Sequence, residues 1–283
     1  MHWGHETLGP NSEPEGNIPE DHHGDLETFV THLNTTFALS NKINLDITSS
    51  FGNRWMDYEG KNPTIHHRNE STRDSMGLYM GTTIIGRYLA LNETIGEGKR
   101  IFLGLGLVIP SKNTLKSNPY ILTKNLQRHT HFAISDGNLK GVFEFQYFNR
   151  KKGLFFFGST FRLDKALKIN DYGYKTGDNF MYNGFIFLHH QKTLQYFFPY
   201  LNLAISHKTK DYWENTKYAE NSDGGFANLG IGINKTFDTF KINFTANTTI
   251  FSWITPANDD AKQIDSSLES YFFALTLSKT FSY

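Results

Sequence analysis

The chain contains no cysteine among its 283 residues, which excludes disulfide bonds and thiolate metal sites. It also contains no run of about 18 apolar residues, the length that a membrane-spanning helix requires. If this chain crosses a bilayer, it must therefore do so as a closed sheet in which every backbone polar group is paired.

An excess of charge of either sign is also absent. The chain carries 28 Lys and Arg against 28 Asp and Glu, without blocks of like charge. This balance offers no general basic face for nucleic acid and no charged interaction tail. The first residues lack the basic and apolar regions of a signal peptide, so the chain is expected to be a mature or shortened form, or not exported.

Aromatic residues are abundant instead. They make up 15% of the chain, with 25 Phe and 14 Tyr, although the mean hydropathy is −0.47. A soluble domain would bury so many rings in a core, whereas a transmembrane barrel can turn them toward lipid and keep a polar lumen and polar loops. The composition favours the barrel.

The last residues, 271–283, carry the most specific pattern. One face of this predicted strand holds Tyr271, Phe273, Leu275, Leu277, Phe281 and Tyr283, and the other holds Ala274, Thr276, Ser278 and Thr280. Only Lys279 interrupts the apolar face, and a lysine near the interface can snorkel. A strand with a terminal aromatic resembles the C-terminal insertion signal of bacterial outer-membrane barrels.

The same period of two recurs along the chain. In the clearest case Phe240, Ile242 and Phe244 alternate with Lys241, Asn243 and Thr245. Eleven strands are predicted in this way, near residues 27–39, 43–48, 77–90, 99–109, 138–149, 153–163, 179–189, 194–207, 225–236, 240–251 and 270–283.

Connection lengths alternate as well. Short turns near 40–42, 91–98, 150–152, 190–193 and 237–239 take turns with long polar loops near 53–74, 110–136, 164–178, 208–224 and 252–268. Short periplasmic turns and long outer loops are typical of transmembrane barrels. A soluble sandwich, the alternative architecture, has no reason to alternate in this way.

Single-chain bacterial barrels usually have an even number of strands, so we predict about twelve. The missing strand would lie before Met1 or within residues 1–24, with the segment His129–Ser135 as a further alternative. The fold class is thus an all-β, antiparallel up-and-down transmembrane β-barrel. Residues 1–24 form a His-rich polar arm or outer loop, and residues 25–283 form a single barrel domain.

One hairpin resembles a known family. Residues Gly77–Leu91, a turn and Arg100–Lys112 are similar to a hairpin of the outer-membrane proteins associated with the phenol meta-degradation pathway, a family of predicted transporters. Pro110-Ser-Lys stands where that family has Pro-Thr-Gly, and Met76-Gly77 stands where it opens with Gly-Asp. The resemblance implies a transport-like barrel and carries no functional residue.

Charged side chains at inward positions form the first candidate site. In an open barrel they would shape the electric field felt by a solute, and in a filled barrel they would pair with one another. These lumen-lining candidates are Asp46, Arg87, Lys140, Glu144, Arg162 and Lys241.

Histidines in the predicted outer segments form the second candidate site. Neutral imidazole is the commonest ligand for Zn or Cu, so capture of a divalent metal is one interpretation, and ordinary solvated side chains are the other. The candidates are His2, His5, His22, His23, His66, His67, His129 and His131.

Three aromatic runs, at 155–157, 196–198 and 271–273, lie near strand ends and are predicted to belong to interfacial girdles. The inward members Phe156 and Phe272 are candidates for contact with an apolar or sugar-like solute.

Catalysis is not expected. The barrel phospholipase type needs a His and a Ser two residues apart on a strand, and the sequence contains no His-x-Ser. The predicted function is an outer-membrane channel or transporter for small solutes in a Gram-negative bacterium, in contact with outer-membrane lipid and lipopolysaccharide. The alternative is a non-conducting barrel that acts as a structural or docking subunit for other envelope proteins.

Overall fold

The structure is a computed structural model, and it describes residues 2–4, 23–58, 78–94, 97–114, 133–150, 155–188, 197–214, 217–219, 222–254 and 270–281. Over these ranges it contains no helix with the length and apolar character needed to cross a membrane. The strands form one twelve-stranded sheet and one small three-stranded sheet.

Eleven long strands build the large sheet, and each covers one of the predicted alternating segments. They are β2 (His23–Ala38), β3 (Ile43–Tyr58), β4 (Tyr79–Asn92), β5 (Gly98–Pro110), β6 (Lys140–Arg150), β7 (Phe155–Ala166), β9 (Asn179–Leu188), β10 (Phe197–Lys208), β13 (Gly224–Phe237), β14 (Phe240–Ile254) and β15 (Tyr271–Lys279).

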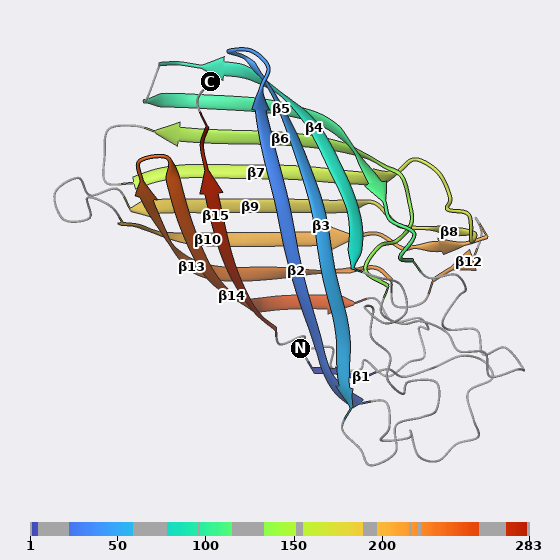
Figure 1. The fold of residues 1–283 in the computed structure, drawn as a ribbon. Coiled ribbons are helices and arrows are strands. Elements are labelled where there is room, and N and C mark those ends of the chain that lie inside the picture. The colour runs from blue at the N-terminus through green and yellow to red at the C-terminus, as the bar shows by residue number, and fades with distance from the viewer. Residues whose placement is uncertain are drawn as a thin grey trace, which may run out of the picture.

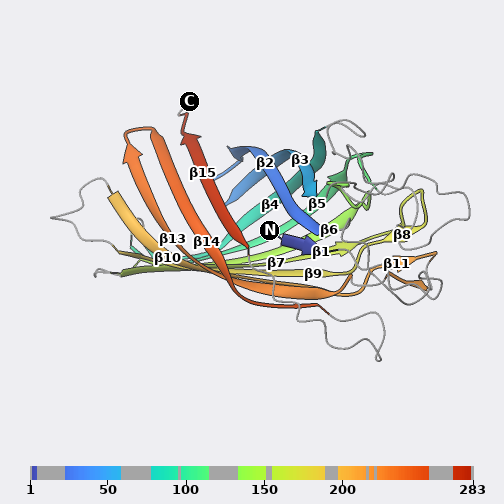
Figure 2. The same ribbon diagram turned by 90° about the horizontal axis from the view of Figure 1, so that it is seen from below.

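Each long strand pairs antiparallel with the next long strand along the chain, and the short strand β1 (His2–Gly4) pairs with β2. The order is β1-β2-β3-β4-β5-β6-β7-β9-β10-β13-β14-β15 (Figure 1). Figure 2 shows the sheet curled into a trough, with β14 and β15 on one side and β2 and β3 on the other. The all-β, up-and-down antiparallel architecture is therefore confirmed. The described ladder forms a curled half-barrel that runs from β1 to β15.

A twelfth strand, β1 (His2–Gly4), pairs with His23, Gly24 and Asp25 at the start of β2. It lies within residues 1–24, one of the two places where the sequence predicts it. Its three residues fall short of the roughly nine to eleven that a membrane strand needs. The alternative segment is described only from Ala133 to Ser135, and these residues are not in a strand.

The sheet is polar on one face and apolar on the other, with the polar face shielded. Leu105, Ile231 and Phe273 are 71%, 65% and 73% exposed, whereas Asp46 and Glu144 are each 4% exposed. Side chains crowd together on the concave side of a curled sheet and splay apart on the convex side. The polar face is therefore the concave, inner face, which is the reverse of a sandwich with an oily interior.

Rings gather at both ends of the apolar outer face. Near the long loops, His207 stacks between Phe180 and Trp253, with ring centroids 6.2 and 5.8 Å apart. Near the short turns, the Lys235 ammonium lies 4.4 and 4.6 Å from the ring centroids of Phe197 and Phe237. Two such belts are what a barrel presents to the two membrane interfaces.

Two segments that the sequence predicts as long loops contain ordered structure. The small sheet joins β8 (Tyr174–Lys175), β11 (Tyr212–Trp213) and β12 (Lys217–Tyr218) at the long-loop end of the molecule (Figure 1). Tyr174, Trp213 and Ala219 form its apolar core, and the rings of Tyr174 and Trp213 lie 4.9 Å apart. The loops after β7 and β10 are therefore packed against each other.

Candidate functional site: the polar inner face and its outer end

Three charged residues from different strands meet on the inner face. Arg87 on β4 forms an ion pair with Asp46 on β3. It also donates two hydrogen bonds to Glu144 on β6, from Nε at 2.5 Å and from a terminal nitrogen at 3.1 Å. The intervening strand β5 carries Gly104, where a Cβ would lie 3.0 Å from the Cβ of Glu144. Glycine at this position thus leaves room for the pair to meet across β5.

A ladder of neutral side chains extends this network toward β2. The Asn34 side chain donates to Thr48 Oγ1 at 2.7 Å, and His32 Nδ1 lies 2.8 Å from Ser50 Oγ. Thr36 donates to Asp46 directly beside the ion pair. Every second residue of a strand points to the inner face, and these polar side chains of β2 and β3 lie opposite one another, so the polar inner face is continuous from β2 to β6.

The other predicted lumen residues are also on the inner face, with different partners. Arg162 donates to Asp164 on its own strand at 2.6 and 2.8 Å. Lys140 pairs with Asp136. Lys241 is exposed, and the register places it opposite Thr236 and Ser278. The structure thus joins Asp46, Arg87 and Glu144 into one network and leaves the other three outside it.

The acids of these pairs are more deeply buried than the guanidinium groups. The side chains of Asp46 and Glu144 are each 5% exposed, while that of Arg87 is 22% exposed. Burial of a charge is tolerated where an opposite charge and hydrogen bonds compensate the lost hydration. The groups that this surface presents most openly to a solute are therefore cationic.

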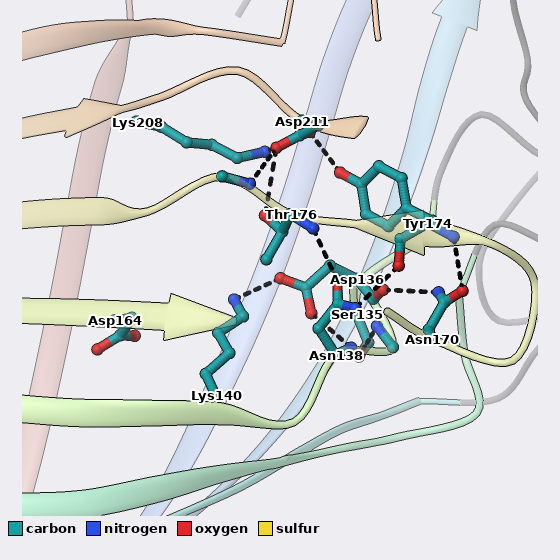
Figure 3. Close-up of polar contacts among 12 residues, drawn as sticks. Ser135, Asp136, Asn138, Lys140, Asp164, Asn170, Tyr174, Thr176, Lys208 and Asp211 are labelled. Carbon is teal, nitrogen blue, oxygen red and sulfur yellow. Dashed lines mark hydrogen bonds and ion pairs between the residues drawn. The ribbon is translucent and has the colours of Figure 1, made fainter. Parts of the chain in front are cut away.

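A second polar network ties three loops together at the outer end of the sheet (Figure 3). Asn138 is 0% exposed, and its amide nitrogen donates to the carbonyls of Lys168 and Tyr174 at 3.1 and 2.9 Å. Its amide oxygen accepts the backbone N–H of Thr176 at 2.9 Å. One side chain thus satisfies three backbone groups that belong to no long strand.

Asp211 anchors the same network from the far side. Its carboxylate accepts hydrogen bonds from the Gly177 N–H and the Lys208 ammonium, both at 2.7 Å. It also accepts bonds from the hydroxyls of Tyr174 and Thr176. A Cβ at Gly177 would lie 2.0 Å from the carbonyl oxygen of Thr209, so only glycine allows this approach. We call Asn138, Tyr174, Thr176, Gly177 and Asp211 the outer-end network.

The outer-end network should loosen at alkaline pH. Burial, together with the charge of Asp211, raises the pKa of Tyr174 well above its ordinary value of 10.0. The unfolded chain therefore releases this proton first, and the stability of the loop cluster falls as pH rises above about 10. The measurement is the amide hydrogen-exchange rate of residues 174–177 at increasing pH. It should rise more steeply with pH than the intrinsic exchange rate of an unfolded chain does.

A Tyr174→Phe variant is the matched control for that prediction. It should lose about 1.5–3 kcal/mol of local stability at neutral pH, because the Asp211 carboxylate loses the hydrogen bond that the Tyr174 hydroxyl donates to it. It should also lose the alkaline transition. An unchanged transition in this variant would assign the pH dependence to another group.

The predicted metal site is only partly covered by the structure. His2 and His23 lie at opposite ends of the short β1–β2 ladder, where the register pairs His23 with Gly4 and His2 with Asp25. His5, His22, His66, His67, His129 and His131 lie outside the described residues. Among the residues that the structure covers, no group of three or more potential ligands gathers. Capture of Zn or Cu stays a prediction.

Sequence reasoning missed the outer-end network because Asn138 falls at the start of a predicted strand, near 138–149, while the other members lie in two predicted loops. The turn signal at Asp136-Gly137-Asn138 was available, and Gly137 adopts a φ of 70° there. Nothing in the sequence indicates that Asn138 contacts Tyr174, because the contact joins two loops.

Comparison with known proteins identifies a shared fold. No protein-family model matches the chain, and a search of curated proteins finds no match. Among solved structures, the chain is similar to an outer membrane channel from Pseudomonas putida F1, with a TM-score of 0.64 and 11% identity over 92% of this chain and 86% of that one. The chain therefore has an outer-membrane barrel fold, and the resemblance to the phenol meta-pathway family stays a prediction.

Proposed function

We propose that this protein is an outer-membrane channel or transporter for small solutes. The observation that carries the proposal is the distribution of polarity in one curled sheet: apolar side chains cover the outer face, and ion-paired side chains line the inner one. An interior of this kind is compatible with water and solutes, while the exterior is compatible with lipid. The outer membrane channel of similar fold supports the same reading.

The proposed function includes a location in the outer membrane and a non-enzymatic role. An outer membrane would place lipid and lipopolysaccharide against the outer face and leave the long loops outside the cell. A non-enzymatic role fits the inner face, because its buried carboxylates are engaged by guanidinium groups that hold them in place.

Planar-bilayer recording of the purified, detergent-folded protein tests the proposal. We expect discrete, reproducible conductance steps that disappear after thermal unfolding. A correctly folded barrel that stays electrically silent and co-purifies with other envelope proteins would contradict a channel and favour the docking alternative.

A further inference from the structure

A continuous arc of aromatic rings lines the inner face near the short-turn ends of the strands. Neighbouring centroids lie 4.7 to 6.4 Å apart from β5 across to β10. Every ring is partly exposed. Alternation along the strands places these rings on the same face as Glu144 and Arg162. The inner aromatic arc consists of Phe102, Phe148, Phe156, Phe185, Phe187 and Tyr200.

Two glycines allow the rings to lie flat against the wall of the sheet. A Cβ at Gly158 would lie 2.3 Å from the ring of Phe185, and one at Gly232 would lie 2.2 Å from the ring of Tyr200. These rings therefore cover the backbone of the neighbouring strand instead of projecting away from it. A ring in this position turns one face to the interior, which is the face that can stack on a solute.

Neutral polar side chains continue the arc at its β10 end. The Tyr200 hydroxyl donates to Asn243 Oδ1 at 3.0 Å and contacts the hydroxyl of Thr245. Two residues further along β10, on the same face of the sheet, the Asn202 side chain donates to Asn247 Oδ1 at 2.7 Å. An amide that accepts hydrogen bonds at its oxygen still carries two N–H donors. The stripe thus offers donors and acceptors without a formal charge.

We infer that the inner aromatic arc and this neutral stripe form a binding track for a saccharide. The C–H face of a sugar ring can stack on the flat aromatic faces, while its hydroxyls pair with the amides and hydroxyls of β10 and β14. A purely apolar solute would leave those polar groups without hydration or partners. Tyr200, Asn202, Asn243, Thr245 and Asn247 carry no formal charge, so this stripe favours a neutral solute. The Arg150 guanidinium, 5.2 Å from the ring centroid of Phe156, lies outside the stripe, and its N–H groups can also donate to hydroxyls. The inference rests on the proposed function and names its solute class.

Binding of maltotriose to the detergent-folded protein tests the inference without requiring conduction. We expect saturation-transfer NMR and calorimetry to detect binding, and Phe187→Leu to weaken it about tenfold, because leucine keeps apolar volume but offers no flat face. Gly232→Ala should weaken binding similarly by tilting the Tyr200 ring away from the wall. In planar bilayers, maltotriose should transiently block the current of the parent protein.

Gly225→Ala is the matched control. A Cβ at Gly225 would lie 2.2 Å from Trp253 and 2.4 Å from the backbone oxygen of Ser206, on the outer face. This variant should lose at least as much stability as Gly232→Ala and still bind maltotriose as the parent does. Equal binding by the parent and Phe187→Leu, or binding of benzyl alcohol but not maltotriose, would overturn the inference. A silent barrel that still binds maltotriose would instead refute the channel.

Discussion

Replacing Arg87 with methionine should lower the free energy of unfolding by about 3–5 kcal/mol, because two buried carboxylates lose their common partner. Asp46 and Glu144 lie on strands separated by β4 and β5, and the Arg87 guanidinium is the group that joins them. Methionine keeps most of the apolar stem, so the loss in the free energy of unfolding comes mainly from removing the guanidinium charge. Urea unfolding of the protein in lipid vesicles, followed by gel mobility, is the measurement.

Two comparisons make this result specific. Lys99→Ala removes an exposed ion pair whose atoms are 3.9 Å apart, and it should cost no more than about 1 kcal/mol. Adding Asp46→Asn and Glu144→Gln to Arg87→Met should restore most of the lost stability, since the stranded charges are gone. If Arg87→Met costs no more than Lys99→Ala, the network does not stabilise the sheet.

The second large effect is expected from Asp211→Ala, which should release the loop cluster while leaving the large sheet folded. Four donors lose one buried acceptor, among them the Gly177 N–H, which then has no carboxylate to bond. The protection of that amide against hydrogen exchange should fall on the order of a hundredfold. Limited proteolysis should then cleave near residues 167–178 or 209–219 first.

Asp171→Ala provides the comparison, because Asp171 is an exposed carboxylate in one of the same loops. It should leave exchange and proteolysis close to those of the parent. Protection lost uniformly across β9 and β10 in Asp211→Ala would mean instead that the outer-end network and the large sheet unfold as one unit.

Much of the large sheet could be predicted because its periodicity is local. In β14 polar and apolar residues alternate from Phe240 to Thr249, so consecutive residues show which face each side chain is on. The small sheet was not predicted, because it has no such local pattern. Its two-residue strands, such as Tyr212–Trp213, are too short to show a period, and they form through contacts between loops.

For the candidate site, the sequence predicts the face on which each residue lies but not its partners. Alternation placed Asp46, Arg87 and Glu144 on the inner face, but which charge meets which depends on the register of four strands and on the space at Gly104. The aromatic run at 155–157 shows the same division. Phe155 and Phe157 are on the outer face as predicted for a girdle, whereas Phe156 joins rings from other strands that only the folded register brings together.

Nitroxide scanning along β14 in lipid vesicles shows whether alternate side chains face hydrocarbon and the interior of the sheet. Labels at Ile242, Phe244 and Ala246 should be relaxed preferentially by oxygen, which concentrates in lipid, and labels at Asn243, Thr245 and Asn247 by a water-soluble nickel complex. We expect this opposition at every residue from 242 to 247. Equal access of both reagents along the strand, or access with a period other than two, would contradict it.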